Sequence, residues 1–222
     1  MSIKHCSAIA SCIVAAVFVS GCQTTNPYSN ESQNAKATNG ALIGALAGAA
    51  IGVASSSKSD RGKGALIGAA SGAALGGGIG YYMDQQEAEL RHKLKGSGVQ
   101  VARSGDEITL IMPGNITFDT GKSNIKGNFT EVLGSVALVL KEFDETAIKV
   151  EGHTDSTGSL SLNQTLSEQR ANSVKYFLQT KQIASGRIHA SGLGPRYPIA
   201  SNSSAAGREA NRRVELKLLP LK

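Results

Sequence analysis

From Val99 onward, the apolar side chains follow two different periods along the chain. Apolar residues at every second position predict short strands, and apolar residues three or four apart predict amphipathic helices. The turn at Ser104-Gly105-Asp106 separates the first two strands and predicts a hairpin. Strands are expected at 99–101, 108–112, 116–118, 147–152, 188–192 and 214–218, and helices at 125–143 and 160–180. This order predicts an α+β fold, an α/β sandwich in which one mixed sheet is covered by two helices.

A different pattern precedes this region, where glycine recurs at every fourth position in two related segments. The segment Gly-Ala-Leu-Ile-Gly at 40–44 is repeated at 64–68, and a polar stretch at 55–63 separates the two arms. Glycines four residues apart lie on one face of a helix, so the sequence predicts a glycine-zipper helical hairpin over 40–83. The glycines of the two ladders are residues 40, 44, 48 and 52 in the first arm and 64, 68, 72, 76 and 80 in the second.

The glycine content favours a membrane setting for this hairpin. A glycine in a water-exposed helix costs about 1 kcal/mol relative to alanine, whereas small residues in lipid let helices approach closely. The second arm is uncharged over 64–83, long enough to span about 30 Å of hydrocarbon. Tyr81 and Tyr82 would then be aromatic anchors at the membrane interface. The alternative is a spacer rich in glycine and alanine. Residues 84–98 are expected to form a helical linker to the globular domain at 99–222.

The first 22 residues have the pattern of an export signal. Lys4 gives a positive start, and the mostly apolar run of 12 residues at 8–19 is too short to span a membrane. The run ends in Val19-Ser20-Gly21-Cys22, which resembles the bacterial lipobox. That resemblance implies that residues 1–21 are removed and that Cys22 is acylated on its sulfur and its new amino group. An ordinary signal peptide with an incidental cysteine is the alternative. Residues 22–39 are expected to form a flexible tether.

Cysteine and charge content exclude further classes of protein. Cys6 and Cys12 lie in the signal, so processing would leave Cys22 as the one thiol, which excludes a disulfide and a thiolate metal site. In lipoproteins that this segment resembles, aspartate after the cysteine favours the inner membrane. Gln23 therefore favours the outer membrane, and an inner-membrane location with an inserted hairpin is the alternative. The formal net charge is +6, but no basic run accompanies it, so nucleic acid is not an expected partner.

One charged residue lies within an apolar stripe. Arg170 follows Leu166 by four residues and precedes Val174 by four, so all three point to the same side of the second predicted helix. An arginine directed inward needs an anionic partner, because an unpaired buried charge is strongly unfavourable. The partner is either a ligand or a structural carboxylate, unless the side chain extends to the edge of the helix.

Four short motifs in the globular region carry a resemblance to a known family. They begin at Asn115 (NITFD), Glu151 (EGHTD), Leu166 (LSEQRA) and Asn211 (NRRVE), and Asn163 precedes the third. In order and spacing, over about 100 residues, they resemble the OmpA-type peptidoglycan-binding domain.

The resemblance implies both a ligand and a site. The ligand is the stem peptide of peptidoglycan at its diaminopimelate residue, whose far end carries an ammonium and a carboxylate on one carbon. Asp155 would receive the ammonium and Arg170 the carboxylate, because a guanidinium grips carboxylates bidentately. This carboxylate would also be the anion that the inward Arg170 requires. The family often has asparagine where this chain has Gly121, so only a backbone contact is available there. The supporting positions carried over from the family are Asp119, Gly121, Thr154, Asn163 and Arg212.

The expected function is therefore that of a lipid-anchored envelope protein that tethers a membrane to the cell wall. Its expected partners are peptidoglycan and membrane lipid, and no cofactor or metal is expected. An enzyme is not expected either. His153 and Asp155 suit a metal pair or an acid–base dyad, but no third ligand is apparent, and His189 has no acidic neighbour in the sequence. The alternative function is that of a membrane protein that forms oligomers or pores through its glycine zippers, with the wall-binding domain as a docking module.

Overall fold

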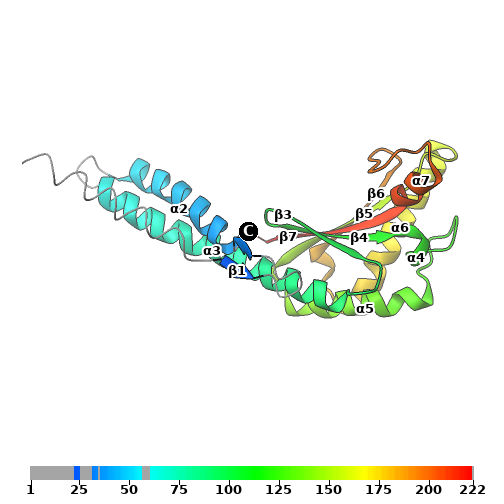
Figure 1. Cartoon of the computed structure of the whole chain (residues 1–222), viewed down its shortest axis with the longest axis horizontal. Helices are drawn as coiled ribbons and strands as arrows, with labels where there is room; N and C mark the ends of the chain where they lie inside the picture. The colour runs from blue at the N-terminus through cyan, green and yellow to red at the C-terminus, as the bar shows by residue number, and fades with distance from the viewer. Residues whose placement is uncertain (1–22, 26–31, 35, 57–60, 222) are drawn as a thin grey trace, which may run out of the picture. The chain divides into compact units, whose positions relative to one another are not determined.

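The computed structural model describes residues 23–25, 32–34, 36–56 and 61–221. The signal segment and Cys22 lie outside the described residues, so their processing stays a prediction. The chain divides into two compact units, 1–81 and 82–222. The first unit contains the antiparallel strands β1 (Gln23–Thr25) and β2 (Ser32–Asn34), helix α2 (Lys36–Ser55) and the first part of helix α3 (Arg61–Lys93) (Figure 1).

Glycines bring α2 and α3 into backbone contact within the first unit. A Cβ atom added at Gly48 would overlap the carbonyl oxygen of Gly68, and a Cβ atom added at Gly52 would overlap that of Gly64. The two helices therefore approach this closely only because these four residues lack side chains. This contact is the packing of the two ladders that the four-residue spacing predicts.

Several of the larger apolar side chains in the described part of the hairpin are exposed, and Leu46 and Leu66 are each 74% exposed. None of the described helices, however, is both long enough and apolar enough to cross a membrane. The spanning second arm expected from its uncharged length is thus wrong for the described helices, because the many glycines add length without apolar side chains.

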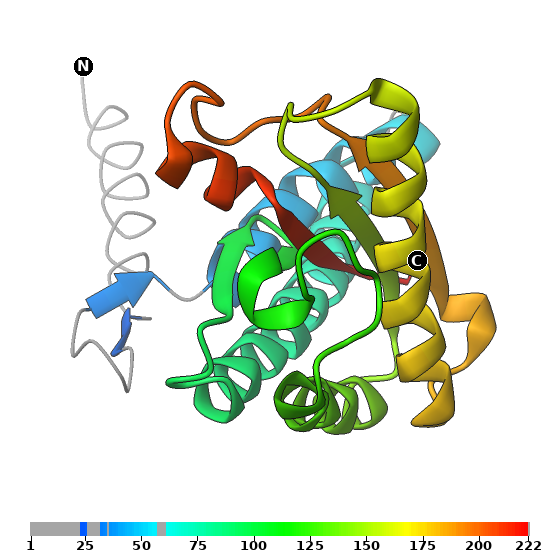
Figure 2. The same ribbon diagram turned by 90° about the vertical axis from the view of Figure 1, so that its right-hand side faces the viewer.

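The second unit is built on a five-stranded mixed sheet with the strand order β3-β4-β7-β5-β6. Neighbouring strands are antiparallel except β5 and β6, which run parallel and are joined through helix α6. Helix α6 packs against β5 and β6, and helix α5 lies beside it (Figure 2). The predicted α+β class is therefore confirmed. The strands are β3 (Gln100–Ser104), β4 (Glu107–Pro113), β5 (Thr146–His153), β6 (Ile188–Gly194) and β7 (Arg213–Pro220). The helices are α4 (Gly114–Thr117), α5 (Gly127–Glu142), α6 (Leu160–Thr180), the 3₁₀ turn η2 (Ser185–Arg187) and α7 (Ala205–Asn211).

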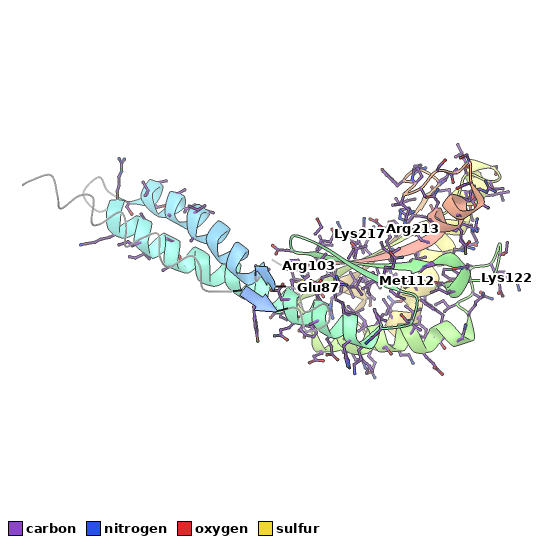
Figure 3. All side chains as sticks on the ribbon, in the orientation of Figure 1. Glu87, Arg103, Met112, Lys122, Arg213 and Lys217 are labelled. Atoms are coloured by element: carbon purple, nitrogen blue, oxygen red, sulfur yellow. The ribbon has the colours of Figure 1, made fainter. Side chains whose placement is uncertain are left out.

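Alternation along the central strands separates an apolar face of the sheet from a polar one. On the apolar face, Leu216 of β7 is fully buried and lies opposite Leu110 of β4 and Val150 of β5. The intervening residues of β7, Glu215 and Lys217, point to the other face. Figure 3 shows the side chain of Lys217 on this strand. The sheet thus has one face for the helices and one for charged side chains.

The last turns of α3 belong to the core of the second unit, where Met83 and Leu90 are fully buried. Tyr82 contacts Phe143 edge to face, with ring centroids 5.3 Å apart, and its hydroxyl accepts a hydrogen bond from the backbone N–H of Glu145. The predicted role of Tyr82 as a membrane-interface anchor is therefore wrong, because its ring packs within the globular unit. The segment expected to be a linker also contributes side chains to this core.

Two local predictions differ from the structure. The strand expected at 116–118 is the helical turn α4, because the N–H of Phe118 bonds back to the carbonyl of Gly114. Phe118 keeps a single β-bridge, to Ile125. Helix α7 was not predicted, because its seven residues are alanine and polar residues around one glycine and carry no apolar stripe.

We expect Gly48→Leu to separate α2 from α3, because the new side chain would overlap the Gly68 carbonyl. Overpacking of this kind costs about 1–3 kcal/mol. Protease resistance of the hairpin in detergent-solubilised full-length protein should fall. Gly78→Leu is the matched control, since a Cβ atom there meets nothing within 4 Å. Equal protease resistance of the two variants would contradict the close contact at Gly48.

Candidate functional site

Asp155 lies just beyond the end of β5, and its carboxylate is held on both oxygens. The residue is 7% exposed. Its Oδ1 accepts a hydrogen bond of 2.7 Å from the backbone N–H of Thr157, and its Oδ2 accepts one of 2.6 Å from Nη1 of Arg212. Arg212 follows α7 directly, so the loop before β7 returns the guanidinium to the end of β5. These two bonds fix the orientation of the carboxylate.

Opposing effects act on the pKa of Asp155. Burial raises it, because a charged carboxylate loses hydration. The hydrogen bonds from Arg212 and Thr157 lower it by a larger amount in total, so the pKa of Asp155 lies below its ordinary value of 3.8. The group is therefore an anion at neutral pH.

Arg170 points inward from α6, as its place in the apolar stripe predicts, and is 4% exposed. Its Nε donates a hydrogen bond of 3.0 Å to the backbone carbonyl of Lys122, and its guanidinium carbon lies 5.1 Å from the centre of the Phe118 ring. Burial and the nearby Arg212 lower the pKa of Arg170, and the charge of Asp155 partly offsets this effect.

Among the described residues, the direct partners of Arg170 are a carbonyl and an aromatic ring, and no structural carboxylate pairs with it directly. The carboxylate of a ligand stays a predicted partner. The direct ion-pair partner of Asp155 is Arg212, at 2.6 Å. Neutral acceptors and a π-face satisfy a guanidinium without neutralising it, so Arg170 keeps its full positive charge for a further partner.

Residues around Asp155 and Arg170 hold the connecting loop in place. Asn163 of α6 donates from its amide to the carbonyl of Thr157, at 2.9 Å. Ser159 caps the same helix by accepting from the N–H of Leu162. The backbone of Thr154 bonds to Gly194 of β6. Among the described residues, no group bonds to the buried hydroxyl of Thr154.

Asp119 and Gly121 lie in the exposed loop between α4 and α5. Asp119 forms ion pairs of 3.6 Å with Lys122 and with Lys126. Gly121 has φ of 70°, a left-handed conformation that glycine adopts without steric cost. This loop also presents the Lys122 carbonyl to Arg170, and Figure 3 labels Lys122 on it.

The site contains two guanidinium groups and one buried carboxylate, because Arg212 and Arg170 both lie near Asp155. It therefore carries excess positive charge beside a fixed anion. This arrangement suits a ligand that carries both a carboxylate and a cationic group. Phe118, Lys122 and Thr157 are site residues that the sequence patterns did not predict. The segment Asp155-Ser156-Thr157 is a local signal for Thr157, because an aspartate side chain often accepts a hydrogen bond from the backbone N–H two residues later. No local pattern indicates the Lys122 carbonyl.

A second cluster lies around His153. From the sequence, His153 lies near Asp155 and no third ligand is apparent. The structure brings Glu151 and Glu215 to His153 instead, with ligand atoms of all three within 4.8 Å of one another. Glu215 was missed because it comes from β7, the strand paired with β5.

The fold and motifs define the class of protein. Residues 117–212 match the OmpA family, and residues 1–84 match the YMGG-like Gly-zipper family. The chain belongs to the OmpA family. Over nearly its whole length it is similar to the probable lipoprotein YiaD of Escherichia coli (strain K12), with 56% identity across 98% of this chain and 99% of that protein.

Two further proteins resemble the globular region. The peptidoglycan-binding protein ArfA of Mycobacterium bovis is 40% identical over 110 residues, which is 49% of this chain and 33% of that protein. The structure of the cell wall anchor of the T6SS from Pseudomonas aeruginosa superimposes with a TM-score of 0.55 and 29% identity, over 59% of this chain and 96% of that one.

We expect Asp155 to make the free energy of unfolding depend on pH in acid. Because its folded pKa lies below 3.8, the unfolded chain takes up the proton first, and the stabilisation is lost as pH falls from about 5 through the folded pKa. Arg212→Gln removes a bond that lowers this pKa, so the folded pKa moves toward the unfolded one and the loss of stability in acid should become smaller. Urea unfolding of full-length protein between about pH 3 and about pH 7 measures this change.

The control is Arg196→Gln, which removes one positive charge from an exposed residue that pairs with no carboxylate in the described part of the chain. Its pH profile should match that of the wild type. An unchanged profile for Arg212→Gln would show that this guanidinium does not set the pKa of Asp155.

Proposed function

We propose that this chain is an outer-membrane lipoprotein whose globular domain lies in the periplasm and binds peptidoglycan non-covalently at diaminopimelate. Three observations support the proposal: membership in the OmpA family, likeness to proteins named as peptidoglycan-binding and as a cell wall anchor, and the charges of the site. The site gives the strongest support, because Asp155 and Arg170 are fixed, buried and of opposite charge.

Recognition of diaminopimelate follows from the groups that the site leaves available. A carboxylate accepts about four hydrogen bonds. Arg212 and the backbone N–H of Thr157 occupy two of these positions on Asp155, so an ammonium can bind at a remaining one. Arg170 has its Nε bonded to Lys122, which leaves its terminal nitrogens to grip a carboxylate. A ligand with both groups on one carbon would satisfy Asp155 and Arg170 together.

The supporting residues have distinct proposed roles. Arg212 and Asn163 hold Asp155 and its loop in the binding orientation. The hydroxyl of Thr154, which lacks a partner among the described residues, is a donor for the bound peptide. Asp119 and Gly121 line the exposed side of the site, where Gly121 offers only its backbone.

Membrane attachment through acylated Cys22 completes the proposed tether. It rests on the lipobox-like segment and on likeness to a protein named as a probable lipoprotein. Several acyl chains, each contributing about 0.8 kcal/mol per buried CH₂, anchor a protein far more firmly than one chain. Gln23 favours the outer membrane, with the inner membrane as the alternative.

Self-association is a second candidate function, favoured by the exposed apolar side chains of the hairpin. The glycine faces already contact each other within the chain, whereas Leu46, Ile51, Leu66 and Ile67 are exposed. A second copy or lipid would cover these residues. Size-exclusion chromatography in detergent, with and without residues 40–80, separates the candidates, because a simple tether stays monomeric in both forms.

We expect Arg170→Leu to abolish binding to purified cell wall. Loss of one partner of a desolvated ion pair costs about 2–5 kcal/mol, on the order of a hundredfold in affinity or more. Leucine fits the apolar stripe between Leu166 and Val174, so the melting temperature should not fall. Cosedimentation of full-length protein with sacculi measures the binding.

Lys175→Leu is the matched control, because it removes the same charge from the same helix outside the site. It should bind as the wild type does. Normal binding by folded Arg170→Leu would overturn the assigned site. Equal binding of the wild type to wall whose stem peptide carries lysine would place the recognition element elsewhere.

We expect Cys22→Ala to accumulate as unprocessed, unlipidated precursor, because acylation requires the cysteine sulfur. Labelling with radioactive palmitate in cells measures the modification. Cys12→Ala, which changes a cysteine within the signal, should be labelled normally. Palmitate that still appears in Cys22→Ala would refute this attachment.

A further inference from the structure

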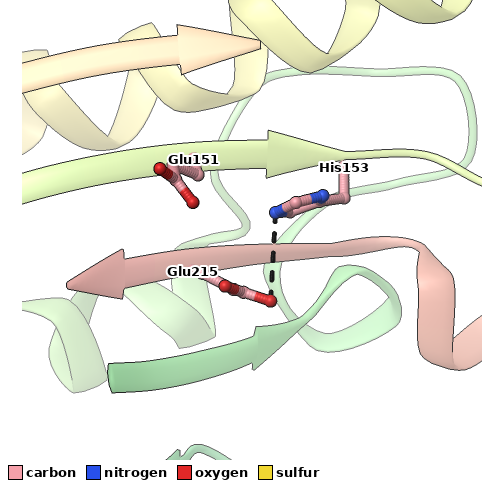
Figure 4. A group of neighbouring side chains, drawn as sticks. All are labelled: Glu151, His153 and Glu215. Atoms are coloured by element: carbon pink, nitrogen blue, oxygen red, sulfur yellow. Dashed lines mark ion pairs between the residues drawn. The ribbon is translucent and has the colours of Figure 1, made fainter. Parts of the chain in front are cut away.

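The polar face of the sheet brings two glutamates together. Glu151 of β5 and Glu215 of β7 lie directly opposite each other in the antiparallel register. Like charges directly opposite on one face destabilise a sheet, so a cation has to lie between them. Figure 4 shows the two carboxylates with His153, which follows Glu151 by two residues and therefore shares its face.

In the structure, protein cations balance this pair. The ammonium of Lys217 lies 2.7 Å from Glu151 Oε2 and 3.4 Å from Glu215 Oε2. Arg213 Nε holds the other oxygen of Glu215 at 2.6 Å. Lys217 is thus the group that bridges both carboxylates, while Arg213 orients only one of them.

His153 is the unusual member of the cluster. It is 2% exposed, and neither of its ring nitrogens has a hydrogen-bond partner among the described residues. Its Nε2 lies 3.9 Å from Glu215 Oε1, beyond hydrogen-bond distance. Buried polar side chains nearly always have a partner, so an orphaned imidazole that faces two carboxylates calls for a further ligand.

The cluster opens into a cavity of about 550 Å³. The loop after β6, including Tyr197 and Ile199, forms its other wall. A small ion therefore has access to the imidazole and to both carboxylates.

We propose that Glu151, His153 and Glu215 form a binding site for a divalent transition metal of the zinc class. One imidazole and two carboxylates are a donor set that Zn²⁺ uses in proteins. A tetrahedral site with bonds of about 2.0 Å places ligand atoms roughly 3.3 Å apart. The three groups already lie within 4.8 Å of one another, so rotation of the side chains closes the site.

Lys217 defines how the metal binds. A divalent ion and the ammonium compete for the same two carboxylates, so the metal displaces Lys217, whose partly exposed side chain swings toward solvent. Arg213 remains on Glu215 and orients it as a supporting partner. The site lies on the polar face of the sheet and shares no residue with the Asp155–Arg170 site, so metal binding can be measured without cell wall.

The test uses full-length protein in detergent, with Zn²⁺ measured by equilibrium dialysis and Co²⁺ by its visible absorption. Wild type should bind one equivalent, with a visible Co²⁺ spectrum typical of a tetrahedral site. His153→Gln should weaken binding by a hundredfold or so, and Glu151→Gln by about tenfold. Lys217→Met should instead tighten it by about tenfold, because the competing ammonium is gone.

His189→Gln is the matched control, since this exposed histidine lies on the neighbouring strand β6, and it should leave affinity unchanged. Circular dichroism checks that each variant is folded. If His153→Gln does not fold, Glu151→Gln and Lys217→Met decide the question with opposite expected shifts. Absence of binding by both wild type and Lys217→Met, or equal affinity in Glu151→Gln and Lys217→Met, would overturn the proposal.

Discussion

The alternation of side chains along β7 is the constraint on which both clusters depend. This strand lies between β4 and β5, and its register with each is antiparallel. Because neighbouring residues point to opposite faces, Leu216 is committed to the hydrophobic core and Glu215 to the polar face. The strand also begins directly after Arg212, which holds Asp155. One strand therefore contributes to the core, aligns Glu215 with Glu151, and positions the Arg212 guanidinium just before its own first residue, beside the end of β5.

Both clusters place charge where hydration is limited, and they balance it in different ways. Asp155 has a guanidinium and a backbone N–H, whereas Arg170 has only a carbonyl and a ring, which leave it positive. Glu151 and Glu215 share one ammonium. Desolvation of such groups is costly unless their partners are already fixed. The surrounding core provides that fixation for Asp155 and Arg170, whereas Lys217 has to move before a metal can bind Glu151 and Glu215.

Local sequence patterns predicted most of the fold, but they did not predict which side chains meet. The periodicity of apolar residues predicted both long helices and most strands around them. The four-residue spacing of Arg170 from Leu166 and Val174 identified it as an inward-facing cation. It could not identify the Lys122 carbonyl as the partner of Arg170, because backbone atoms have no sequence signal and the two residues lie 48 positions apart. Glu215 was missed for a similar reason, since only the strand order places it beside His153. The strand predicted at 116–118 is wrong because three residues are too few to distinguish the period of a strand from that of a helix.

The end of α3 has a mechanical consequence. In the proposed tether between a membrane and the cell wall, tension would travel along the covalent chain, and α3 contains the boundary between the two units. Its last turns are locked into the globular unit by Met83 and Leu90, and by Tyr82 against Phe143. A pulling force would therefore act on the packed side chains of α3 before it acts on the sheet. In that tether, these turns would keep a load on the anchor from deforming β7, which carries Glu215, and β5, which leads to Asp155.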